Sequence, residues 1–155
     1  MGLDMYLSRR IFIGAMYRSR AITGRIELFS CGKPIPVKLE LLASVTEDIY
    51  HGSQTWWLWE WFNHEAPELI EANGLEHVIS VDTLQKLCRT CEEVLSAKGT
   101  EAFSALCGNQ LHYPVRKEIA PDDLLNLVQE IEELVRVLKD IEQQPDIDFH
   151  LAVSW

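Results

Sequence analysis

Hydrophobic and polar positions alternate near both ends of the chain. Leu3, Met5 and Leu7 are separated by Asp4 and Tyr6, and residues 147–153 carry an apolar side chain at every second position. Successive side chains of a β-strand point to opposite faces, so a period of two predicts strands over 2–8 and 147–153. We expect both strands to belong to one mixed sheet that holds the two chain ends together.

Further strands are predicted inside the chain. Residues 22–30 and 37–49 are rich in strand-forming residues, and between them Cys31, Gly32 and Pro34 provide a turn. Such a pattern predicts a hairpin of these two segments. A short apolar run over 75–81 predicts another strand.

Three longer segments carry apolar residues with the spacing of amphipathic helices: 55–66, 83–97 and 121–143. Asp82 is expected to cap the second helix, and Pro121 to lie in the first turn of the third. A shorter helix is expected within 99–110. These elements predict an α+β fold with one domain, residues 1–155, in which three main helices pack on a small mixed, mainly antiparallel sheet.

Charge is distributed unevenly along the chain. Hydrophobic residues make up 47% and charged residues 25% of the 155 residues, as in ordinary globular domains. Residues 1–40 hold seven Lys and Arg and three acids, a net charge of +4, whereas 41–155 hold seven Lys and Arg and 21 acids, a net charge of −14. An acidic surface repels phosphate groups, so direct nucleic-acid binding is disfavoured. A protein partner is favoured, in particular a basic or nucleic-acid-binding one.

The four cysteines, Cys31, Cys88, Cys91 and Cys107, are expected to be free thiols, because no export signal or membrane-spanning segment precedes them. Cys88 and Cys91 form a CxxC pattern, but they lie inside a predicted helix, six residues after Asp82, and no second ligand pair accompanies them. We interpret them as buried structural residues. No metal site and no cofactor are predicted.

Four of the five tryptophans fall between positions 56 and 61. One helix cannot bury all of them, because they cover more than one face. Trp57, Trp61 and His64 share a face by their spacing of four and seven residues. This face either anchors the helix in the core or lines a groove or partner interface, since tryptophan is enriched at binding hot spots.

Acidic residues follow the predicted helix 121–143, among them Glu130, Glu133 and Asp140. They form either a solvated helix face or a contact surface for a basic partner. In the second case, reversing the charge of all three should slow association and leave the fold intact.

The opening residues, Met-Gly-Leu-Asp-Met-Tyr-Leu over 1–7, resemble the N-terminus of a family of small uncharacterised proteins of bacteriophages and prophages. In that family a helical Trp is followed seven residues later by a His, as with Trp57 and His64. Members often end in a strand closing on Ser-Trp, as with Ser154 and Trp155. The resemblance implies a phage-associated accessory role in the cytoplasm of a bacterial host, with no established activity.

Three functional hypotheses follow, in order of preference. The first is a macromolecular interaction protein, including an inhibitor of a host defence system of the anti-CRISPR kind. The second is a small-molecule binding protein whose pocket lies at the Trp57/His64 face. The third is an enzyme, which would require Asp4, Tyr6, His64 or His150 to converge.

Overall fold

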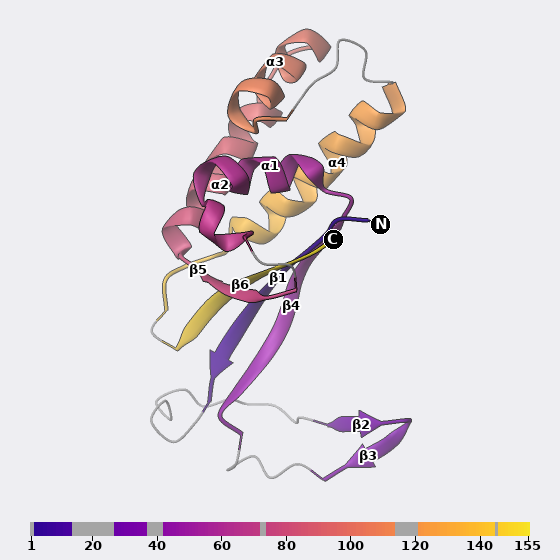
Figure 1. Ribbon diagram of the computed structural model, residues 1–155, viewed down its shortest axis with the longest axis vertical. Helices are drawn as coiled ribbons and strands as arrows, with labels where there is room; N and C mark the ends of the chain where they lie inside the picture. Colours follow the sequence, from indigo (N-terminus) through magenta and orange to yellow (C-terminus); the bar gives the residue numbers. More distant parts are fainter. Residues whose placement is uncertain (1, 14–26, 37–41, 72–73, 114–120, 145) are drawn as a thin grey trace.

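The computed structural model describes residues 2–13, 27–36, 42–71, 74–113, 121–144 and 146–155. In this part of the chain the strands are β1 (Asp4–Phe12), β2 (Leu28–Ser30), β3 (Lys33–Ile35), β4 (Ser44–Ser53), β5 (Glu76–Ile79) and β6 (Ile147–Ser154). The helices are α1 (Trp56–Glu65), the short 3-10 helix η3 (Pro67–Leu69), α2 (Val81–Leu95), α3 (Thr100–Gln110) and α4 (Pro121–Leu138). The predicted α+β class is confirmed (Figure 1).

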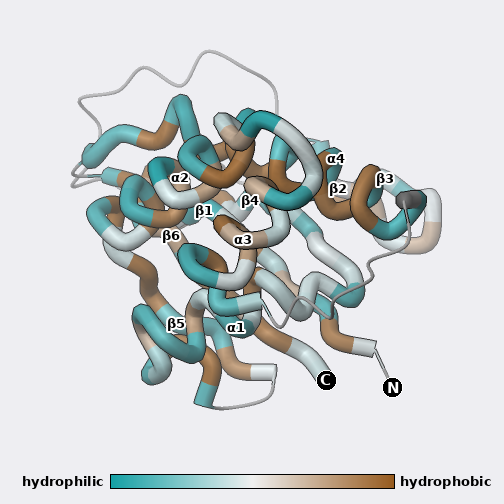
Figure 2. The backbone as a smooth tube through the Cα atoms, turned by 90° about the horizontal axis from the view of Figure 1, so that it is seen from above, coloured by the Kyte–Doolittle hydropathy of each residue, from teal (hydrophilic) through white to brown (hydrophobic). Residues whose placement is uncertain are grey.

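The main sheet has the strand order β4-β1-β6-β5. The two terminal strands are neighbours, as predicted, with Asp4 opposite Ser154 and Leu7 opposite Leu151. All three pairings between the described strands of this sheet are antiparallel, so the expected parallel component is missing there. Both chain ends therefore lie side by side (Figures 1 and 2).

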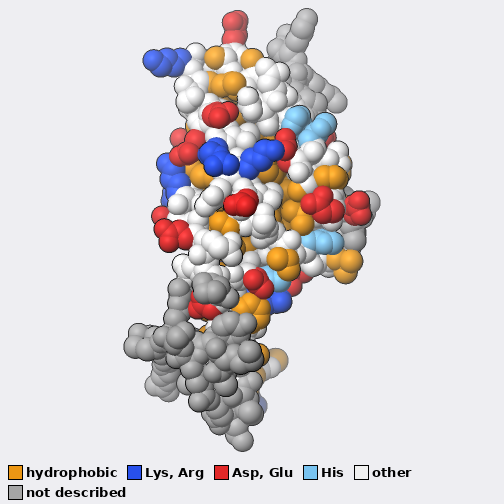
Figure 3. All heavy atoms as spheres, turned by 90° about the vertical axis from the view of Figure 1, so that its left-hand side faces the viewer, with side chains coloured by type: hydrophobic (Ala, Val, Ile, Leu, Met, Phe, Trp, Pro, Cys, Tyr) orange, Lys and Arg blue, Asp and Glu red, His pale blue; other side chains and the backbone are white. Residues whose placement is uncertain are grey.

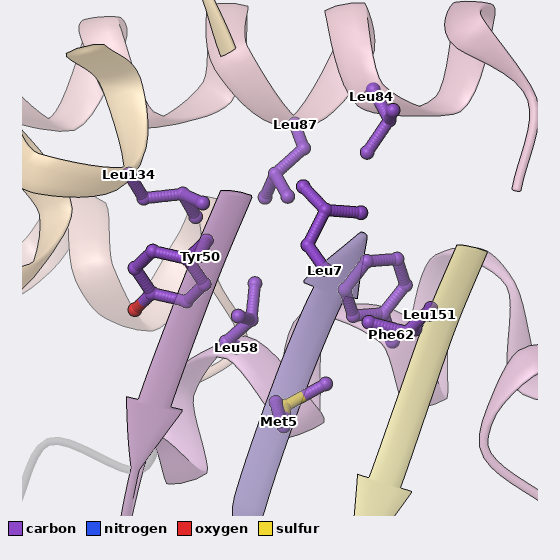
Figure 4. A pocket seen from close by; sticks show the side chains of 9 residues that line it. All are labelled: Met5, Leu7, Tyr50, Leu58, Phe62, Leu84, Leu87, Leu134 and Leu151. Atoms are coloured by element: carbon purple, nitrogen blue, oxygen red, sulfur yellow. The ribbon is translucent and has the colours of Figure 1, made fainter. Parts of the chain in front are cut away.

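The helices bury one face of this sheet. Met5 and Leu7 of β1, Tyr50 of β4 and Leu151 of β6 point toward side chains of α1, α2 and α4 (Figure 4). The space left among them is about 10 Å³, at the lower limit of what holds one water molecule. We conclude that this part of the core is closely packed and offers no room for a ligand.

The helix boundaries differ from the predicted ones in two places. Ser80, not Asp82, caps α2, because the Ser80 hydroxyl accepts a hydrogen bond from the Thr83 backbone N–H at 3.1 Å. The last helix ends at Leu138 and not at 143. A turn over Lys139 and Asp140 follows, in which the Ile141 backbone N–H donates a hydrogen bond to the Leu138 carbonyl at 3.2 Å.

The expected hairpin of 22–30 with 37–49 is wrong in its second strand. β2 pairs with β3 across the turn at Cys31 and Gly32, whereas β4 begins at Ser44 and pairs with β1. Residues 22–26 and 37–41 lie outside the described part of the chain. A β-bulge opposite Leu7 and Ser8 shifts the register of β4, so that Tyr50 lies opposite Leu7 and enters the core. Simple alternation along 37–49 could not show this shift.

The cysteines are free, and three of them, Cys88, Cys91 and Cys107, are buried, as predicted for Cys88 and Cys91. Burial raises the pKa of the Cys107 thiol to about 11 and also raises the pKa of Cys88 and Cys91. The thiolate is the reactive form, and burial also blocks the reagent.

We expect an aromatic disulfide reagent at pH 8 to label exposed Cys31 rapidly and the three buried thiols only after denaturation. Mass spectrometry of the native and denatured samples would locate the labels. Modification of Cys88 or Cys91 at the rate of Cys31 would contradict the buried arrangement, and chelators should leave the melting temperature unchanged.

Candidate functional site

Helix α1 divides its tryptophans between the core and the surface. Trp57 and Trp61 are 2% and 1% exposed, whereas Trp56 is 50% exposed. Successive residues of a helix are about 100° apart, so Trp56 and Trp59 are centred on the side opposite the middle of the buried face, which Trp57, Leu58, Trp61 and Phe62 form. Only Trp56 and Trp59 are therefore open to a partner.

His64 does not share the environment of Trp57 and Trp61, which corrects the prediction of a common functional face. His64 lies on the same side of α1 as Trp57, about two turns further along, but it is in the last turn of the helix and is exposed. Its ring stacks on His112, with ring centroids 4.0 Å apart. The adjacent Glu65 pairs with Lys86, and one of its oxygens lies 3.8 Å from the Nε2 of His112.

Glu130, predicted as an acidic contact residue, takes part in the fold. The Trp57 indole Nε1–H donates a hydrogen bond to the Glu130 Oε2 at 3.0 Å. Burial raises the pKa of the Glu130 carboxyl, an effect that this hydrogen bond opposes. Charge reversal at Glu130 would remove this hydrogen bond between α1 and α4, so a substitution there is expected to cost stability.

Glu133 and Asp140, the other two predicted acidic contacts, are exposed. On the face shown in Figure 3, Asp and Glu side chains are scattered among Lys and Arg side chains and do not gather into one patch. Of the three predicted acidic contacts, Glu130 therefore takes part in the packing of α1 on α4, whereas Glu133 and Asp140 are open to solvent.

A surface pocket of about 350 Å³ opens beside the outer face of α1. Its wall is formed by Gly2, Leu3, Trp56, Trp59 and Trp155, and we call it the tryptophan pocket. The rings of Trp56 and Trp59 are 6.4 Å apart between centroids and inclined by 71°. Volumes of 300 Å³ and above are usual for ligand sites, on the order of what this pocket offers.

The sheet supplies the rest of the tryptophan pocket. Leu3 directly precedes β1 and Trp155 directly follows β6, and the pairing of Asp4 with Ser154 places them next to each other. The Gln54 backbone N–H donates to the Leu3 carbonyl at 2.5 Å, which joins the start of β1 to the segment that enters α1. Sequence reasoning named Trp57 and Trp61 as binding residues and missed this set, because Trp155 is remote in sequence.

Part of the hypothetical enzyme site is present on the other face of the sheet. Asp4 and Tyr6 alternate with the buried Met5, so they point away from the helices. Tyr6 stacks on His51 with ring centroids 4.4 Å apart, and the His51 Nε2 lies 3.6 Å from the Asp4 Oδ1. His64 belongs to α1 and is not part of this group.

His150 lies on the same face in a second group. Its Nδ1 is 3.7 Å from the Glu76 Oε2, and Glu76 also accepts hydrogen bonds from Ser8 at 3.4 Å and Arg10 at 2.9 Å. The His150 Nε2, the atom that would act as a base, is buried and has no hydrogen-bond partner among the described residues. A substrate could not reach this atom in the observed conformation.

Comparison with protein-family models, with curated proteins and with solved structures gave no match to this chain. The fold and the site therefore give a structural class and no family. The protein is an α+β domain with an aromatic pocket where its terminal strands meet α1. Among the described residues, no helix is long and apolar enough to cross a bilayer, and no group of His, Cys, Asp and Glu is arranged to hold a metal ion.

Proposed function

We propose that this protein acts by binding a macromolecular partner, and that the tryptophan pocket is the contact site. The observation that carries this proposal is the exposure of aromatic surface: Trp56 is 50% and Trp155 41% exposed. Large exposed aromatic side chains around a concave surface are typical of binding hot spots. A phage-associated accessory role, as the resemblance of residues 1–7 implies, agrees with a protein that acts on a host component.

The different burial of the tryptophans of α1 supports this assignment. Trp57 and Trp61 anchor the helix in the core, so the fold does not require Trp56 to be a tryptophan. The rigid sheet and the buried side of α1 hold the pocket wall in place before a partner arrives. Preorganised walls reduce the entropy that is lost on binding.

The proposal predicts that the double substitution Trp56→Ala and Trp59→Ala removes partner binding. A hot-spot tryptophan contributes about 2 kcal/mol or more, so even if only one of the two is a hot spot, affinity should fall by at least about thirtyfold, mainly through faster dissociation. The partner would first be captured from a bacterial lysate with the wild-type protein and identified by mass spectrometry. Its dissociation rate would then be measured with purified proteins.

A matched control is Leu125→Ala on α4, which removes another exposed apolar side chain, 57% exposed, outside the pocket. This control should bind the partner like the wild type. Unchanged binding by the Trp56/Trp59 variant, with circular dichroism showing an intact fold, would refute the proposed contact site.

A further inference from the structure

The walls of the tryptophan pocket have the geometry of an aromatic cage. Trp56 and Trp59 are inclined by 71°, and Trp155 stands on the strand side of the same pocket. Indole faces carry negative electrostatic potential, and cations bind over them within about 6 Å of the ring centroid. Two walls near a right angle let one cation contact both rings at once.

The sequence around α1 is acidic, and none of the residues that line this cage is a Lys or Arg. No Lys or Arg occurs between Lys38 and Lys86, whereas nine Asp and Glu do. One of these acids, Glu60, lies one helical turn after Trp56 on the outer side of α1 and makes no ion pair among the described residues. Both the ring faces and the nearby charge therefore favour a cation.

The basic residues of β1 are remote from the pocket. Arg9 lies six residues beyond Leu3 along an extended strand, a distance of about 20 Å. Arg9 is also paired with Glu47 at 2.6 Å, and Arg10 is paired with Glu76 at 2.9 Å. Neither guanidinium is available to occupy the cage.

We infer that the tryptophan pocket selects a cationic group on an apolar stem, namely the ammonium or guanidinium of a Lys or Arg side chain of the partner. The inference rests on the proposed function for the identity of the pocket as the contact site. It adds the chemical class of the partner side chain that enters the pocket. The pocket would then bind a basic segment of the partner in preference to an apolar one.

The test compares choline with 3,3-dimethylbutan-1-ol, which has the same shape but no charge. Indole N–H resonances of the full chain would be followed by NMR during titration with each compound. We expect choline to bind about tenfold more tightly, and to shift the signals of Trp56, Trp59 and Trp155. Trp57 and Trp61 serve as internal references because they are buried.

Two variants separate the contributions. Trp56→Leu keeps an apolar wall without the indole face, so it should weaken choline binding several-fold and affect the neutral alcohol less. Glu60→Gln should weaken choline binding alone, whereas Glu133→Gln, an exposed acid on α4, should have no effect.

Equal affinity for choline and the alcohol, or shifts confined to other residues, would overturn the inference, as would a lack of binding by both compounds. The proposed function fails on a different result, namely retention of the partner by the Trp56/Trp59 double variant. A partner that is lost from that variant, together with equal binding of both probes, would leave the contact site in place with an apolar anchor.

Discussion

Deletion of residues 147–155 is expected to abolish cooperative folding. β6 lies inside the main sheet, between β1 and β5, so its loss removes the pairing of both neighbours. The deletion also removes four buried apolar side chains, those of Ile147, Phe149, Leu151 and Val153. At about 1.5–3 kcal/mol for each, their loss approaches the whole net stability of a domain, about 5–15 kcal/mol.

The matched control is removal of Trp155 alone, which keeps β6 and takes away one wall of the tryptophan pocket. This shorter deletion should melt cooperatively near the temperature of the full chain and should lose partner affinity. Thermal unfolding followed by circular dichroism and calorimetry distinguishes the two proteins. A cooperative transition near the parent temperature after deletion of 147–155 would show that β6 does not hold the sheet together.

The substitution Trp61→Ala is expected to destabilise the protein by about 3–5 kcal/mol. Trp61 is 1% exposed, and its ring meets Phe62 edge to face with centroids 5.0 Å apart. Alanine would leave a cavity in the core that the surrounding side chains cannot fill. Urea denaturation at constant m-value would give the change in the free energy of unfolding.

Trp56→Ala is the control, because it removes the same side chain from a half-exposed position on the same helix. Surface substitutions usually change stability by about 0.5 kcal/mol or less. The two variants should therefore behave in opposite ways, with Trp61→Ala unstable and Trp56→Ala stable but deficient in binding. A loss of stability of similar size in both would show that Trp56 belongs to the core, which would remove the basis of the proposed contact site.

Much of the secondary structure could be predicted from local patterns. The alternation near both chain ends identified β1 and β6, and apolar spacing identified α1, α2 and α4. These patterns were reliable because each of these segments buries one face along most of its length. Prediction failed for β4, which pairs with β1 and forms no hairpin with 22–30, and whose bulge opposite Leu7 and Ser8 brings Tyr50 to the core side. A bulge depends on the partner strand, so it leaves no local pattern.

The sequence by itself determined the fold class, the free and buried cysteines of α2, and the conclusion that one helix could not bury all four of its tryptophans. Only the tertiary structure decided which tryptophans remain outside. Pairing of β1 with β6 brings Leu3 and Trp155 together, and α1 adds Trp56 and Trp59 to them. The same packing ties Glu130 to Trp57 and separates His64 from the core. Local patterns report burial of one face of one element, whereas a pocket forms from elements that meet in space.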